Sequence, residues 1–569
     1  ECLMEEEPLL SPAEATRKAL AQIAGPVIAT TLVLLAVFVP TAVLPGIVGE
    51  LYRQFAVTLS ASMVLSSVCA LTLTPALCAC LLRRRVVPTT GPLASFNRFI
   101  NRTRDGYVAL TQKINRYAIT TAAVILAAGV VTWMSYQQLP DGFLPQEDEG
   151  YLFINVQLPE GAALPRTQQV MEQMYQVVKK NPAVADVIKI TGFSLLGGGN
   201  SPDSGFGIVL LKAWHERPPI AQLLPPLQQQ LAAIPAATIM AFVPPPVSGL
   251  GNAAGFDLRI QALEGQSPQA LAQAAHAVIT AANQHPQLSR VFTTFSATVP
   301  EMSLTIDRER AALMQVPVSR IVAVLQTAFG GSEAGDFTRN GRQFRVQVQN
   351  EMRFRQYSEQ LLALTVRSDT GAQVRLNQLV TLKPSLGAPY IMQYNQFPAL
   401  AIGGGGAQGV SSGQAMQAMT EVLAQHLPEG YDYSWSGMSY QEQQTGNQAV
   451  LIYLAAVLFA WLFMVAQYES WSVPLAVMLS VVFAAAGAVA GLHLMGFTND
   501  VYAQIGLVLL MGLAAKNAIL LVEFARDRRA SGVPIGQAAK QAASQRFRAV
   551  MMTAISFIVG VLPLVMASG

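Results

Sequence analysis

A single lysine stands inside a long apolar run in the last quarter of the chain. Lys516 is the only charged residue between Val501 and Val522. A charge at membrane depth is costly unless it is paired, so such a residue is a candidate functional site. A lysine that reaches the membrane surface is the alternative, but Arg526 lies about ten residues, or about 15 Å, further along a helix. The apolar runs offer no mid-membrane carboxylate, so the partner comes from elsewhere or the lysine is neutral.

Two more polar residues lie close to the last apolar run. Arg546 and Thr553 are seven residues apart and therefore share one face of a helix. Arg548 is most simply an anchor at the membrane surface. Arg546 is either a second anchor or turns inward toward a carboxylate relay.

A glycine-rich segment, Gly192–Gly199, joins two strand-like runs. A flexible loop with apolar side chains could gate or line an apolar pocket, although an ordinary long turn fits equally well. Apolar residues on or near the surrounding strands are either core or pocket lining: Phe153, Ile188, Phe193, Leu195, Ile208, Met240 and Phe242.

Motifs for catalysis, metals and cofactors are missing from the sequence. The glycine run 403–406 lacks the Lys-Ser/Thr of a phosphate-binding loop, and no GxSxG elbow occurs. The five histidines are scattered and form no metal motif, so we expect no metal and no cofactor. The four cysteines, Cys2, Cys69, Cys78 and Cys80, avoid the polar middle of the chain, which therefore has no disulfide framework.

The composition is that of a membrane protein. Hydrophobic residues make up 52% and charged residues 12% of the 569 residues, whereas soluble domains carry about 25% charged residues. The net charge of +3 is too small to indicate nucleic acid binding. Seven apolar runs are long enough, or nearly so, to cross a bilayer: 23–48, 54–82, 117–136, 448–467, 471–497, 501–525 and 549–569.

Basic residues in two connecting segments set the orientation of these spans, because such segments stay in the cytoplasm. Between the second and third spans, only Asp105 opposes the basic residues Arg83, Arg84, Arg85, Arg98, Arg102, Arg104, Lys113 and Arg116. Before the last span stand Arg526, Arg528, Arg529, Lys540, Arg546 and Arg548. The polar stretch of about 310 residues between the third and fourth spans then lies outside and can hold two or three domains.

This outer stretch alternates between strand-like and helix-like patterns. Strands are predicted at 151–158, 184–192, 206–214 and 238–243, with helices at 165–181 and 220–233, which is a split βαβ order. A second unit begins at 256–295, and its second half returns at 399–435. The roughly 100 residues between them form an inserted domain with its own strands at 342–349 and 373–376.

Several motifs resemble the hydrophobe/amphiphile efflux pumps of the resistance-nodulation-division superfamily, of the acriflavine-resistance type. They are EATRK at 14–18, VFVPTAV at 37–43, YRQFAVT at 52–58, LTPALCA at 73–79, FLPQEDEG at 143–150, VQLPEGA at 156–162, WSGMSYQE at 435–442, YESWSVP at 468–474, TNDVY at 498–502 and GLAAKNAILLVEFA at 512–525. The resemblance covers nearly the whole chain in order. It implies an inner-membrane proton/drug antiporter, which is a secondary transporter and not an enzyme.

The resemblance also implies an architecture: a polytopic α-helical membrane protein with periplasmic α+β porter subdomains and an inserted α+β docking domain. Its parts would be a cytoplasmic segment 1–22; spans 23–136, matching family helices five to seven, with the cytoplasmic loop 83–116; a first porter subdomain 137–250; a second porter subdomain 251–297 and 392–440; the docking domain 298–391; and spans 447–569, matching helices eight to eleven. Expected partners are two further copies in a homotrimer, a periplasmic adaptor (membrane fusion) protein, an outer-membrane channel, amphiphilic small molecules, protons and the lipid bilayer.

Site roles follow from the same resemblance. Lys516, Arg546 and Thr553 match a proton relay whose two aspartates would precede Glu1. The sequence begins with Glu1 instead of Met and stops inside an apolar run at Gly569, so both of its ends are expected to be cut. Gly192, Gly197, Gly198 and Gly199 match a switch loop. The distal pocket would be lined by Phe153, Ile188, Phe193, Leu195 and Ile208, and the proximal pocket by Asn155, Met240 and Phe242. Relatives often carry phenylalanine where this chain has Ile188, Leu195 and Ile208, so fewer stacking contacts are expected.

Two other functions fit the superfamily. A metal-ion exporter is disfavoured because the spans lack extra acidic residues and the outer region lacks a tight Met, Cys or His cluster. A non-transporting export or assembly factor is disfavoured by the pair of porter-like units with an inserted domain.

Overall fold

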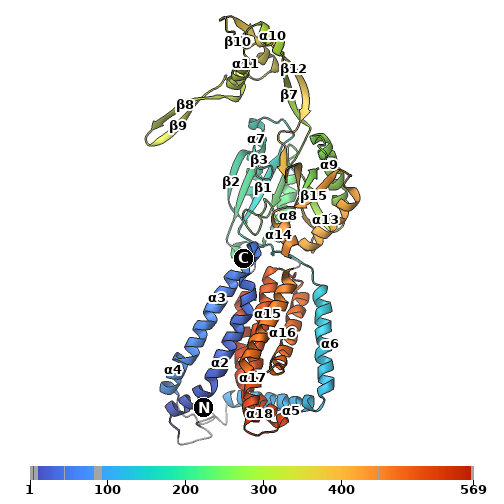
Figure 1. Ribbon diagram of the computed structural model, residues 1–569. Helices are drawn as coiled ribbons and strands as arrows, with labels where there is room; N and C mark the ends of the chain where they lie inside the picture. The colour runs from blue at the N-terminus through green and yellow to red at the C-terminus, as the bar shows by residue number, and fades with distance from the viewer. Residues whose placement is uncertain (1–3, 5–9, 44, 83–91, 446–447, 566–569) are drawn as a thin grey trace.

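The computed structural model describes residues 4, 10–43, 45–82, 92–445 and 448–565. Figure 1 shows three tiers: a helix bundle, two sheet-containing units next to one end of it, and a smaller unit farthest from the bundle. The basic residues Arg83, Arg84 and Arg85, as well as Cys2 and both ends of the sequence, lie outside the described residues.

Seven helices among the described residues are long and apolar enough to cross a membrane, in agreement with the number predicted. They are α2 (Pro12–Ala42), α3 with α4 (Gly46–Leu71 and Leu73–Leu81), α6 (Ala118–Gln137), α15 (Gln448–Tyr468), α16 (Val473–Met495), α17 (Val501–Ala530) and α18 (Ile535–Val565). The second span is interrupted at Thr72, where the backbone leaves helical geometry.

Several helices extend beyond the predicted spans. Helix α2 begins at Pro12, and not at residue 23, because Ser11 and Glu14 form a capping box that satisfies its first amides. Helix α18 begins at Ile535, so Arg546 and Arg548 lie inside a continuous helix. The predicted loop 83–116 contains helix α5 (Pro92–Arg116). This helix is amphipathic, so a search for continuous apolar runs does not detect it.

Helix α17 occupies the middle of the bundle. At Gly512 an added Cβ would collide with the side chain of Leu34 on α2, so the glycine permits the close approach of these two helices. Nearer the sheet units, Tyr52 of α3 donates a buried hydrogen bond to Gln504 at 3.0 Å. Asp500 caps the first turn of α17 by accepting from the amide of Ala503 at 2.8 Å.

The first sheet unit follows α6. It consists of β1 (Tyr151–Gln157), α7 (Leu164–Lys179), β2 (Val184–Ser194), β3 (Gly199–Leu211), α8 (Ile220–Ala232) and β4 (Thr238–Phe242). The antiparallel sheet has the order β2-β3-β1-β4, which is the order of a split βαβ unit. Leu152, Ile154 and Val156 are fully buried in the core that this unit forms with α7 and α8.

The second sheet unit is assembled from two distant parts of the chain. The first part holds β5 (Phe256–Ala262), α9 (Pro268–Gln284) and β6 (Leu288–Phe292); the second holds β13 (Met392–Tyr394), β14 (Phe397–Gly406), α13 (Ser412–His426), β15 (Tyr431–Trp435) and α14 (Gly437–Thr445). Strand β14 pairs with both β5 and β6, and β15 pairs with β5. The predicted return of the chain after an insertion is therefore present.

The inserted segment forms the distant third tier. Strands β7 (Val299–Ile306) and β12 (Val380–Gly387) pair along their full length and carry it away from the second unit. Beyond them lie α10 (Arg308–Leu313), α11 (Val318–Leu325), α12 (Ser358–Leu362), β10 (Thr365–Arg367) and β11 (Gln373–Arg375). The hairpin of β8 (Ser332–Arg339) and β9 (Arg342–Val348) projects outward as an arm (Figure 1).

Candidate functional site

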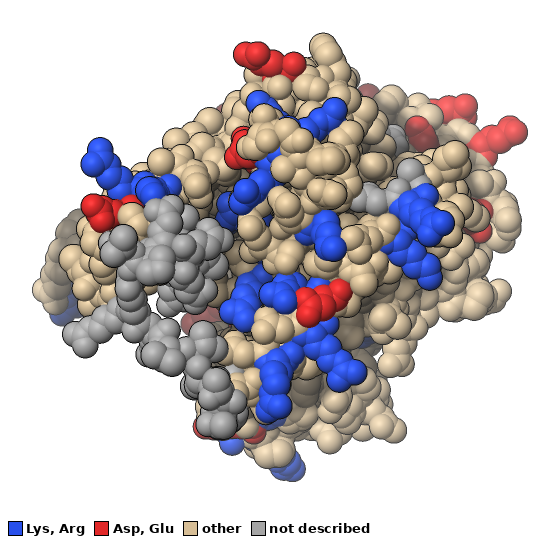
Figure 2. Space-filling model, turned by 90° about the horizontal axis from the view of Figure 1, so that it is seen from below, with Lys and Arg blue, Asp and Glu red and all other residues tan. Residues whose placement is uncertain are grey.

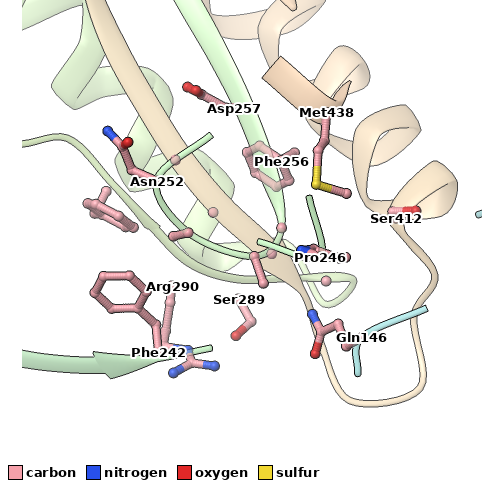
Figure 3. A pocket seen from close by; sticks show the side chains of 18 of the residues that line it. Gln146, Phe242, Pro246, Asn252, Phe256, Asp257, Ser289, Arg290, Ser412 and Met438 are labelled. Carbon is pink, nitrogen blue, oxygen red and sulfur yellow. The ribbon is translucent and has the colours of Figure 1, made fainter. Parts of the chain in front are cut away.

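A cavity of about 530 Å³ lies between the two sheet units. Strand β4 contributes Met240 and Phe242 to its wall, and strand β5 contributes Phe256. Figure 3 labels Phe242 and Phe256 among the lining side chains. The linker 142–146, which connects α6 to β1, and the glycine run 403–406 of β14 also belong to the wall. The cavity is therefore in contact with both sheet units and with the connection to the bundle.

The lining combines apolar rings with balanced charges. Phe242, Phe256 and Phe292 are joined by Asp257 and Arg259, whose side chains form a 3.0 Å ion pair. Burial raises the pKa of Asp257, and the Arg259 guanidinium partly opposes that rise. A wall that offers both aromatic rings and polar groups suits small amphiphilic molecules, which have an apolar and a polar part.

Glu442 is the second buried carboxyl of the cavity wall. It lies on α14, and its carboxylate accepts a hydrogen bond from the Ser412 hydroxyl at 2.8 Å. Burial raises its pKa to about 7; the Ser412 hydrogen bond opposes the rise and repulsion from Asp141 adds to it. This carboxyl can therefore change its charge near neutral pH.

A second cavity, of about 490 Å³, lies where α6 and α17 meet the linker. Glu442 and Phe143 line both cavities, together with Gly142. The linker is held there by the amide of Gly142 donating to Asn499 O at 3.4 Å and by the amide of Val501 donating to Phe143 O at 3.1 Å. Glu442 thus stands at a junction between the bundle and the cavity above it.

Six of the residues predicted to line a pocket lie on one face of the first sheet. One cross-strand row places Ile188, Ile208, Phe153 and Phe242 opposite one another on β2, β3, β1 and β4. The neighbouring row is Ile190, Phe206, Asn155 and Met240. Residues opposite each other in a ladder share a face, so the fold gathers them although they are spread between Phe153 and Phe242 in the sequence.

Aromatic rings connect the cavity with the far end of this face. The ring centroid of Phe153 lies 5.9 Å from that of Phe242 and 5.1 Å from that of Phe206, and Phe206 lies 6.2 Å from Phe193. Asn155 is buried beside them, and its Oδ1 accepts no hydrogen bond from the described residues. The sequence prediction missed Phe206, although strand alternation with Ile208 could have found it.

The glycine-rich segment is shorter as a loop than predicted. Strands β2 and β3 extend into it, so only residues 195–198 form the turn. Gly192 lies within β2 with φ of 82°, where the pairing register shifts, and Gly199 begins β3. Gly197 and Gly198 line the cavity, and the carbonyl of Leu195 accepts from Asn252 at 3.1 Å.

The predicted pocket residues therefore divide into two groups. Met240, Phe242, Gly197 and Gly198 line the cavity itself. Phe153, Asn155, Ile188, Phe193, Leu195 and Ile208 lie on the adjoining sheet face or hairpin and are not part of its wall. Glu442 was missed as a site residue, because nothing in the sequence indicates that this carboxyl is buried.

The three predicted relay residues lie on α17 and α18, but their side chains do not form one connected group. Lys516 is exposed on the side of the bundle and forms no ion pair within the part of the chain that the structure describes. Arg546 stacks over Phe524 at 5.1 Å, eight residues or about 12 Å along α17 from Lys516. Thr553 donates to Val550 O of its own helix at 2.9 Å.

The depths of these residues can be compared, because α17 and α18 are packed neighbours joined by a short loop. Arg546 lies level with Phe524. Thr553 is seven residues further along α18, about 10 Å, which brings it close to the level of Lys516 on the antiparallel partner. Lys516 and Thr553 therefore share a depth, and Arg546 lies nearer the basic end of the bundle.

Comparisons with known proteins identify relatives of this chain. The model of the AcrB/AcrD/AcrF family matches residues 2–569. The chain is 38% identical over 581 residues to the multidrug/solvent efflux pump membrane transporter MepB of Pseudomonas putida, covering 100% of this chain and 55% of the relative. It is 36% identical over 583 residues to the multidrug export protein AcrF of Escherichia coli (strain K12), covering 100% and 56%.

A third relative, the multidrug resistance protein MdtF of Escherichia coli (strain K12), is 35% identical over 579 residues, covering 99% of this chain and 55% of its own. The chain spans about half the length of the curated relatives it matches. Together with seven helices suited to cross a bilayer, the match over nearly its whole length shows that this chain is a polytopic membrane protein and a member of the AcrB/AcrD/AcrF family.

Proposed function

We propose that the protein is the inner-membrane component of an efflux pump that exports hydrophobic and amphiphilic compounds by proton antiport. The observation that carries the proposal is the cavity between the two sheet units, whose wall contains both aromatic rings and the Asp257–Arg259 ion pair. Such a wall suits molecules with an apolar body and a polar or charged end. The names of the relatives, which describe multidrug and solvent efflux, point in the same direction.

In this proposal the sheet units are periplasmic porter subdomains, 137–250 and 251–297 with 392–440, and the segment 298–391 is the docking domain. Their side of the membrane follows from the basic residues at the opposite end of the bundle. The protein would act as a homotrimer with a periplasmic adaptor and an outer-membrane channel. The projecting β8–β9 arm is suited to contacts within such an assembly.

Substrate would be held by the cavity wall and by the adjoining face of the first sheet. Met240 and Phe242 form the part shared by both, and the ring of Phe153 continues the apolar surface from there. The hairpin turn at 195–198 reaches the cavity through Gly197 and Gly198, so a shift of this turn would change the shape of the site. We assign it the role of the switch loop.

Coupling to protons would use Lys516. Its ammonium is available for a carboxylate supplied by another segment of the protein, and protonation of that carboxylate would break the pairing and allow the helices to repack. Thr553, at a similar depth, can take part in the same site. Arg546 would act lower in the bundle, where it stacks on Phe524.

Dye accumulation in a pump-deleted host expressing the intact gene tests both parts. Phe242→Ala should change the substrate profile at unchanged membrane level, whereas Phe354→Ala, an exposed phenylalanine of the inserted segment, should not. Lys516→Ala should abolish export of all substrates, and Lys383→Ala should preserve it. Full export by the Lys516 variant would refute the proton coupling, and an unchanged profile in the Phe242 variant would refute the assignment of the cavity.

A metal-ion exporter is the second candidate. Its cargo would need a cluster of ligands along the path, and the described part of the chain holds no group of three or more His, Cys, Asp or Glu side chains placed to bind a metal ion. Measurement of metal tolerance in the same host separates the two candidates.

A further inference from the structure

Helix α5 lies across the end of the bundle that is farthest from the sheet units (Figure 1). It packs on α18, where the rings of Tyr107 and Phe547 are 5.4 Å apart and Arg548 donates to Asn101 at 3.1 Å. Only Tyr117 separates α5 from α6, which is one of the membrane-spanning helices. Helix α5 must therefore lie at the level where the bilayer surface begins.

Two different stripes run along the free sides of α5. With 3.6 residues per turn, the apolar residues Phe96, Phe99, Leu110 and Ile114 fall within one narrow arc. Their exposed fractions range from 42% to 66%. The basic residues Arg98, Arg102, Lys113 and Arg116 fall within a second arc, about 100° around the helix from the first.

The basic stripe has no acidic counterpart within the described residues. None of its four members forms an ion pair there; the pair on this helix joins Arg104 to Asp105. Arg98 donates to the Ser95 hydroxyl at 3.2 Å, which leaves its charge uncompensated. Figure 2 shows basic side chains gathered over this end of the bundle, to which α17 and α18 add Arg528, Arg529 and Arg548.

We propose that Arg98, Arg102 and Arg548 form a binding site for the phosphate of an anionic phospholipid in the headgroup layer beside α5. Asn101 lies between the two α5 arginines in sequence and accepts a hydrogen bond from Arg548, so Arg548 reaches the same part of α5 that carries Arg98 and Arg102. The exposed apolar stripe would enter the acyl-chain region beside it. A soluble polyanion such as RNA needs the charges but not this stripe, which favours lipid.

The test uses the whole protein in a neutral detergent, with fluorescent phosphatidylglycerol as the probe and phosphatidylcholine as its zwitterionic counterpart. Each basic residue near an anionic surface contributes about 1 kcal/mol, so Arg98→Gln/Arg102→Gln should raise the Kd for phosphatidylglycerol about 30-fold. Arg308→Gln/Arg345→Gln removes the same charge far from the bundle and should leave the Kd unchanged. The difference should shrink at high salt.

A second pair of substitutions separates lipid from other anions. Phe96→Ser/Phe99→Ser keeps every charge and should also weaken phosphatidylglycerol binding, while binding of a short RNA should not depend on it. The proposal is overturned if the arginine variant binds phosphatidylglycerol as the control does, if phosphatidylcholine binds equally well, or if the phenylalanine variant is unaffected. Gel filtration and an unfolding curve for each variant show whether a loss of binding comes from misfolding. If the glutamine variant misfolds, Arg98→Lys/Arg102→Lys takes its place in the test: this variant keeps both charges and must bind phosphatidylglycerol like the wild type for the proposal to stand.

Discussion

Glu442 allows a sharp test of the junction between the membrane bundle and the cavity. Its carboxyl is buried, accepts the Ser412 hydrogen bond at 2.8 Å and is repelled by Asp141. Replacement by glutamine preserves the size of the side chain and an oxygen that can accept from Ser412. The Glu442→Gln variant therefore removes the ionisable group while keeping its packing.

The size of the effect follows from the pKa shift. Burial raises the pKa of Glu442 from 4.5 to about 7. The hydrogen bond from Ser412 lowers this pKa, and repulsion from Asp141 raises it further. The folded protein then binds this proton more tightly than the unfolded chain, so stability is lost as the pH rises from about 4.5 to about 7. At 1.36 kcal/mol per pKa unit, the loss is about 3 kcal/mol.

Thermal unfolding of the protein in detergent, followed between about pH 5 and pH 8, measures this loss. The wild-type midpoint should fall over this range, and the Glu442→Gln midpoint should fall much less, so that the variant is the more stable protein at the alkaline end. Glu421→Gln, which alters an exposed carboxylate of α13, should follow the wild type. A Glu442→Gln curve parallel to that of the wild type would show that the carboxyl is ionised and solvated in the folded protein.

Two further substitutions test how the residues just before β1 and the second sheet are held in place. The side chain of Arg217 is 1% exposed and donates to both carboxylate oxygens of Asp148 at 2.7 and 2.5 Å. Arg217→Gln should cost about 3–5 kcal/mol locally and speed hydrogen exchange at the amides of Gly150 and Ile220, which donate to the same carboxylate. Unchanged exchange at these two amides would show that the ion pair does not hold this part of the chain. Gly255→Ala should destabilise the second sheet by more than about 1–3 kcal/mol, because Gly255 has φ of 113° and an added Cβ would meet the carbonyl of Gly404. The matched control is Gly265→Ala, since Gly265 has φ of 75° and open space around it. Equal resistance of the two variants to proteolysis would rule out the clash at Gly255.

Local patterns in the sequence predicted most of the elements. Continuous apolar runs predicted the seven membrane helices, because a helix of about 20 apolar residues is the form in which a chain can cross hydrocarbon with its amides satisfied. Strand alternation likewise indicated the order of elements in the first sheet unit. The ends of the elements were less well predicted: α2 and α18 start earlier, since capping and helix continuity outweigh the loss of hydrophobicity at residues 12–22 and 535–548.

The candidate site depended more on the tertiary structure. Lys516 is identifiable from the sequence, because a lone charge in an apolar run is conspicuous without knowledge of any neighbour. The rows that align Ile188 with Phe242, the burial of Glu442 and the basic stripe of α5 beside α18 depend on which elements pack together. Strand register, desolvation and the juxtaposition of charges are properties of pairs of distant residues, and only the folded chain brings those pairs into contact.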